Sequence, residues 1–120
     1  MAKYMLILGG ADLDKRSGNA EIAPVIFARY MSWMRGLQES GRFVSTHALQ
    51  DQSGARLTVR GGQVVEGPFI ESKEAVGGVC IVEAGSLEEA VSIGRECPVL
   101  DVLNGFVEVR AIADVRPPRS

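Results

Sequence analysis

The chain has 120 residues, with 13 Lys and Arg against 15 Asp and Glu, and 46% of its residues are hydrophobic. A chain of this length has room for one hydrophobic core, so we expect a single domain over residues 1–113 and a tail over residues 114–120. The composition is that of an ordinary soluble globular protein. Because the formal net charge is −2, the surface is not strongly basic, and we expect no direct nucleic-acid partner.

The sequence contains no pattern that predicts export, a membrane span or a metal site. Residues 4–8 are apolar but are followed by Gly9 and Gly10, which makes the run too short for a signal peptide or a membrane helix. We therefore expect a cytoplasmic protein with no membrane partner. Without an export signal, Cys80 and Cys97 are expected to be free thiols. One histidine and no closely spaced cysteines argue against a transition-metal site, so we expect neither a metal nor a cofactor.

The first elements are a strand, a polar connection and a helix. Residues 3–9 are apolar on both faces of a strand, which is typical of a central position in a sheet. The polar connection over residues 10–23 fits either a lid over a pocket or a solvated loop. A helix is expected from Pro24 to about Ser40, with Gly41 ending it. Helical spacing predicts that one stripe of this helix packs on the sheet, broadened by Ile26 and Trp33; the stripe is Phe27, Tyr30, Met31, Met34 and Leu37.

A second strand over residues 42–49 contains His47, the only histidine of the chain. The ordinary pKa of an imidazole suits proton transfer near neutral pH, which makes His47 a candidate catalytic residue. A structural or merely exposed histidine fits the same pattern. Residues 56–60 and 63–66 flank Gly61 and Gly62, a pair that predicts a tight β-hairpin.

The second half of the chain begins with another strand over residues 78–84, apolar on both faces for most of its length and therefore expected at the centre of the sheet. Ser86 and Glu89 have the spacing of a capping box, so a helix is expected to begin there and to end at Pro98. Gly94 on its inner face predicts a close approach to the sheet. After a turn, residues 106–113 form the last strand.

This order predicts an α+β fold with the ferredoxin-like β-α-β-β-α-β plan and an inserted hairpin, in which both helices cover one face of the sheet. In the last strand, Val107 and Val109 would face the helices, which sends Phe106, Glu108 and Arg110 to the opposite, open face. A large apolar face without helices is normally an interface. We therefore expect a homodimer whose two sheets meet face to face around a cavity.

The stretch from Glu66 to Glu74 contains a turn signal, one aromatic residue and four ionisable residues within nine positions. Gly67 and Pro68 restrict the backbone to one turn shape, which is expected to anchor Phe69 in the core and to aim Glu66 at the open face near Arg110. Carboxylates beside cations in an apolar cleft suit an acid–base site for an anionic small molecule. Glu66 and His47 are the candidate catalytic residues, and the candidate ligand-binding residues are Gly67, Pro68, Phe69, Glu71, Lys73 and Arg110.

Together with the Ser-Leu-Glu-Glu-Ala helix start, the Cys97-Pro98 pair and the Val-Glu-Val-Arg strand over 107–110, this stretch resembles the DGPF branch of the YCII-related family. The resemblance covers residues 3–113 and implies a dimeric α/β barrel with the motif lining a cleft. It also implies either an enzyme-like protein, since the wider superfamily carries a proposed histidine–aspartate pair, or an accessory domain, since some members occur beside transcription sigma factors. Glu66 stands where the branch has aspartate, and His47 matches no family motif.

Two interpretations of the charged residues stay open. In the first, Glu66, Lys73 and Arg110 bind a small molecule in a cleft at the dimer interface, with or without catalysis. In the alternative, these charges only pair with one another across the interface, and the protein is a non-enzymatic accessory domain that binds another protein, linked to transcription regulation.

Overall fold

A computed structural model describes residues 1–10, 22–50, 54–67, 76–101, 104–116 and 118. Six strands and three helices lie within this part of the chain. In chain order they are β1 (Ala2–Gly9), α2 (Ile22–Glu39), β2 (Phe43–Ala48), β3 (Arg56–Arg60), β4 (Gln63–Gly67), β5 (Val76–Ala84), α3 (Leu87–Arg95), α4 (Pro98–Asp101) and β6 (Phe106–Ala111).

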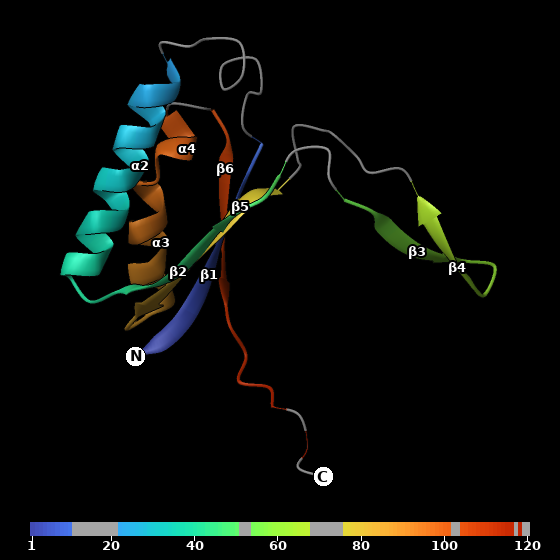
Figure 1. Cartoon of the computed structure of the whole chain (residues 1–120). Helices are drawn as coiled ribbons and strands as arrows, with labels where there is room; N and C mark the ends of the chain where they lie inside the picture. The colour runs from blue at the N-terminus through green and yellow to red at the C-terminus, as the bar shows by residue number, and fades with distance from the viewer. Residues whose placement is uncertain (11–21, 51–53, 68–75, 102–103, 117, 119–120) are drawn as a thin grey trace.

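The main sheet has four strands in the order β2-β5-β1-β6, and each neighbouring pair is antiparallel. The helices lie on one side of this sheet (Figure 1), so the chain has an α+β fold. β1 and β5 occupy the two central positions, as predicted from strands that are apolar on both faces. The sheet is open, and the expected dimeric barrel stays a prediction.

The hydrophobic core lies between the sheet and the helices. Alternate side chains of the central strands are buried there, namely Tyr4, Leu6, Leu8, Cys80, Val82 and Ala84. Val107 and Val109 of β6 also pack against this core, as expected. A Cβ at Gly94 of α3 would lie 3.2 Å from Val107 Cγ1 and 3.9 Å from Leu6 Cδ2, so the predicted close approach of this helix to the sheet is confirmed.

The face that α2 buries differs from the predicted stripe. Ile26 and Leu37 are buried, and Tyr30 and Trp33 are partly buried against the core, whereas the side chain of Phe27 is 65% exposed. The prediction was wrong for Phe27 and Met31. Because α2 is apolar around much of its circumference, apolar residues at helical spacing occur on more than one face, and the spacing does not say which face is buried. The indole N–H of the partly buried Trp33 is hydrogen-bonded: Trp33 Nε1 donates to the backbone oxygen of Ile93 at 3.3 Å.

The helix ends follow local chemistry. α2 ends before Gly41, whose φ of 74° only glycine adopts easily. At α3, Glu89 N donates to Ser86 Oγ at 3.2 Å, as in a capping box, and Glu89 Oε2 accepts from the N–H of Gly85, the residue before the cap, at 2.8 Å. The prediction that Pro98 only ends a helix was incomplete, because Pro98 also begins the short α4, where proline is favoured in the first turn.

The β3–β4 hairpin forms a separate two-stranded sheet. Gly61 and Gly62 have positive φ angles of 61° and 79°, the conformation that a tight hairpin turn requires. The hairpin stands on the side of the main sheet opposite the helices (Figure 1). Among the described residues, no helix is long and apolar enough to cross a membrane.

Candidate functional site

The open face of the main sheet carries two rows of side chains that run across all four strands. Residues that pair directly in an antiparallel sheet share a face, so the strand register defines both rows. The first row is Ser45, Ile81, Met5 and Arg110, and the second is His47, Val79, Ile7 and Glu108. The centre of each row is apolar and half-buried, and the ends are polar or charged. We call these eight residues the open face.

Ionisable side chains lie at both margins of the open face but do not meet. Arg110 NH1 lies 3.8 Å from Glu108 Oε2 on β6, and both side chains are more than half exposed. His47 lies on β2, at the other margin. Three strand spacings separate His47 from Glu108 in their shared row, roughly 14 Å, so one protomer brings no acid–base dyad together here.

Glu66 and Gly67 lie on β4, in the hairpin rather than in the main sheet. The Glu66 side chain is exposed and lies opposite Leu57 of β3 in the strand register. The structure therefore does not bring Glu66 next to Arg110 within one protomer. Pro68, Phe69, Glu71 and Lys73 fall outside the described residues, so their predicted roles stay predictions.

The two cysteines are free and buried, as expected. Burial raises the pKa of the Cys80 thiol to about 11 and raises the pKa of Cys97 as well. Such thiols are poor nucleophiles, because the thiolate is the reactive form. Within the described ranges, no three His, Cys, Asp or Glu side chains gather where they could hold a metal ion.

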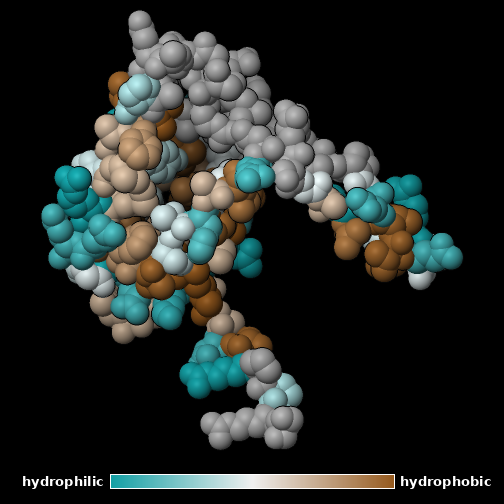
Figure 2. Space-filling model, viewed as in Figure 1, coloured by the Kyte–Doolittle hydropathy of each residue, from teal (hydrophilic) through white to brown (hydrophobic). Residues whose placement is uncertain are grey.

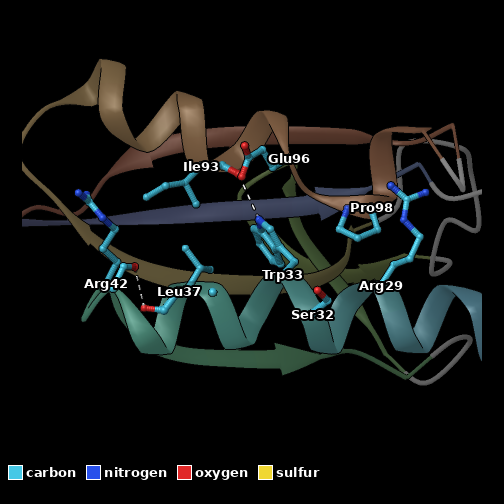
Figure 3. A pocket seen from close by; sticks show the side chains of 10 residues that line it. Arg29, Ser32, Trp33, Leu37, Arg42, Ile93, Glu96 and Pro98 are labelled. Atoms are coloured by element: carbon cyan, nitrogen blue, oxygen red, sulfur yellow. Dashed lines mark hydrogen bonds between the residues drawn. The ribbon is translucent and has the colours of Figure 1, made fainter.

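A groove of about 520 Å³ lies on the other side of the molecule, between α2 and the α3–α4 segment. Trp33, Leu37 and Ile93 point into it (Figure 3). Small residues on α2 leave the groove open, because a Cβ at Gly36 would meet nothing within 4 Å. This groove was not predicted from the sequence, although Ser32, Gly36 and Ser40, four residues apart, indicate a helix face with small side chains.

The two arginines of the groove already have acidic partners. Arg29 forms an ion pair of 2.8 Å with Asp101 of α4, and Arg42 pairs with Glu89 of α3. A guanidinium that is already paired contributes less to binding an anion, because the ligand has to compete with the existing carboxylate. Arg110 of the open face also has an acidic neighbour, but its 3.8 Å pair with Glu108 is longer than the 2.8 Å pair between Arg29 and Asp101, so the groove is the weaker candidate for an anion site.

Comparison with known proteins places the chain in a family. Residues 11–116 match the family model described as the YCII-related domain. The chain belongs to the YCII-related family. Over 54 residues, the YCII-related chain is 35% identical to "Uncharacterized protein R00369" of Rhizobium meliloti (strain 1021). That match covers 45% of this chain and 44% of the relative, so it spans less than half of either protein.

Proposed function

We propose that this YCII-related chain belongs to the DGPF branch, forms a homodimer through the open face, and binds a small anionic molecule in the cleft between the two sheets. The observation that carries the proposal is the open face itself. Its centre is apolar and half-buried, and the helices of the described residues all lie on the other side of the sheet. Contact of such a face with water is unfavourable. A second copy supplies the missing layer, and Arg110 at the margin supplies a cation for the ligand.

Glu66 and His47 are the proposed acid–base groups of this cleft. His47 lies at the β2 margin of the open face and is exposed, so it can exchange protons with a ligand in the cleft. Glu66 lies on the hairpin, and the segment that continues from it carries Phe69, Glu71 and Lys73. In this proposal, Lys73 assists Arg110 in holding the anion.

A protein-binding role is the second candidate. Phe27 and Met31 on α2 are exposed apolar side chains, and a neighbouring apolar pair of this kind suits a protein partner better than a small anion. This role needs no ligand in the cleft.

Light scattering and thermal-shift screening test the proposal together. We expect the mass of a dimer at micromolar concentration and stabilisation by a subset of small carboxylates or phosphates, about 2.7 kcal/mol at a ligand concentration of 100 times Kd. Arg110→Ala should abolish that stabilisation, while Arg116→Ala, an exposed arginine of the tail, should leave it unchanged. A monomeric mass would overturn the dimer, and the absence of any stabilising anion would favour the protein-binding role.

A further inference from the structure

The hairpin has an apolar face on which no other described element packs. The strand register places Leu57, Val59 and Val64 on one face, together with Glu66. Their exposed fractions are 66%, 72% and 70% for the three apolar side chains, and hydrophobic atoms gather on the hairpin in Figure 2. We call these four residues the hairpin face. An isolated two-stranded hairpin is at best marginally stable in water, so this face needs a partner layer.

The hairpin stands away from its own protomer. β3 and β4 pair only with each other in the described part of the chain, and they lie beyond the open side of the main sheet (Figure 1). The Cα radius of gyration is 16.6 Å, compared with about 13.6 Å expected for a compact chain of 120 residues. A protomer that covers the open face would lie on the same side as the hairpin.

We infer that the hairpin is an arm that packs its apolar face on a second copy of the chain and delivers Glu66 to the partner's open face, beside Arg110 of the partner subunit. The inference rests on the proposed homodimer and adds a residue to the proposed cleft from the other protomer. Each Arg110 would then have Glu66 of the other chain beside it, while His47 stays at the opposite margin of the same open face.

Charge and symmetry both favour a second copy over an unrelated protein. On the hairpin face, the apolar side chains lie next to the negatively charged Glu66. On the open face, the apolar side chains lie next to the positively charged Arg110. A guanidinium has five N–H donors, so Arg110 can bind a second carboxylate in addition to Glu108, which is 3.8 Å away. In a twofold dimer the same contact forms twice, so both arms and both open faces are covered at once.

Charge reversal in mixed dimers tests the contact between chains. Glu66→Arg and Arg110→Glu should each weaken the homodimer about tenfold or more, because each places like charges together at both contacts. In an equimolar mixture of the two variants, the heterodimer has opposite charges at both contacts. We expect native mass spectrometry to show heterodimer in excess of the statistical half, with a dissociation constant close to that of the wild type.

Matched variants separate this contact from general charge effects. Arg60→Glu changes the opposite face of the hairpin, so it should not weaken the homodimer or pair with Arg110→Glu. The double variant Val59→Ser/Val64→Ser should also weaken the dimer, whereas Thr58→Ser should not. All four side chains are exposed and belong to the hairpin, outside the helices and the main sheet, so the helical signal in far-ultraviolet circular dichroism should be unchanged.

The outcomes distinguish the arm from the homodimer itself. A wild-type monomer would overturn both the homodimer and the arm. A wild-type dimer whose reversed variants show no excess of heterodimer would overturn the arm and leave the face-to-face dimer standing. The third outcome combines two results: a chain that carries both reversals regains the wild-type stability, and the mixture of single variants shows no preference for the heterodimer. Together they would show that Glu66 and Arg110 meet within one protomer.

Discussion

Glycine positions show how closely the backbones of this fold approach one another. At Gly105, just before β6, an added Cβ would collide with the backbone oxygen of Gly9 and lie 2.8 Å from Val99 Cγ2. A backbone oxygen cannot rotate away as a flexible side chain can. The contact explains why the turn into β6 requires a residue without a side chain.

We predict that Gly105→Ala lowers the free energy of unfolding by about 1–3 kcal/mol, the usual cost of overpacking. The control is Gly36→Ala on α2, where a Cβ meets nothing within 4 Å and alanine should stabilise the helix by about 0.5–1 kcal/mol. Urea unfolding of both variants checks the prediction. Equal stability of Gly105→Ala and the wild type would show that the turn moves to accommodate a methyl group.

The buried thiols predict a pH dependence. Burial raises the pKa of Cys80 from 9.0 to about 11, so in this window the native state retains a proton that the unfolded state has lost. The free energy of unfolding therefore falls as pH rises from about 9 to 11. Urea unfolding at several pH values should show a shallower decline for Cys80→Ala than for the wild type. An identical decline in both proteins would mean that other groups cause it.

At the scale of an element, the orientation of α2 is the clearest difference between expectation and structure. Ile26 is 7% exposed and Phe27, the next residue, is 65% exposed. Adjacent residues on a helix point about 100° apart, so only one of them can face the core. The inner position is taken by the aliphatic side chain, and the aromatic one lies on the flank.

We predict that Ile26→Ala lowers the free energy of unfolding by about 2–5 kcal/mol, since it opens a cavity in the core. Phe27→Ala should change it by about 0.5 kcal/mol or less, since surface substitutions seldom do more. Thermal or urea unfolding of the two variants shows whether the α2 face with Ile26 or the face with Phe27 packs on the core. A larger loss for Phe27→Ala would favour the stripe expected from the sequence, or a partner layer on that flank of α2.

At the scale of the whole molecule, the open face and the hairpin face are apolar, and no other element of the described chain forms a second layer on them. In a homodimer both are covered, and the stability of the fold is then coupled to association. Anything that binds the native state and not the unfolded chain raises the unfolding midpoint with its concentration, and this applies equally to a second copy of the same chain.

We predict that the thermal midpoint rises with protein concentration for the wild type and loses this dependence in Ile81→Lys, which places a charge at the centre of the open face. Val115→Lys, in the exposed tail, is the matched control and should retain the dependence. Differential scanning fluorimetry over a range of about 100-fold in protein concentration provides the measurement. A wild-type midpoint that stays constant over this range would argue against a dimer.

Much of this architecture was determined by local sequence. The two-sided apolar strands predicted that residues 3–9 and 78–84 lie at the centre of the sheet, and the order β2-β5-β1-β6 confirms it. The Gly61-Gly62 turn, the Ser86 cap and the end of α2 at Gly41 were also predicted correctly. Each depends on backbone chemistry within a few residues, so a single sequence contains the information. The family was likewise identified from short motifs.

Only the tertiary structure decided which side chains meet over long separations. The sequence did not predict that Arg29 pairs with Asp101 or that Arg42 pairs with Glu89, and the Glu66–Arg110 neighbourhood expected from it does not form within one protomer. Periodicity gives the spacing of apolar residues along an element but not the rotation of α2 about its axis or the place of a hairpin beside a sheet. Those depend on how separate elements share one core, because the packing free energy belongs to the contacts between elements and not to any one of them.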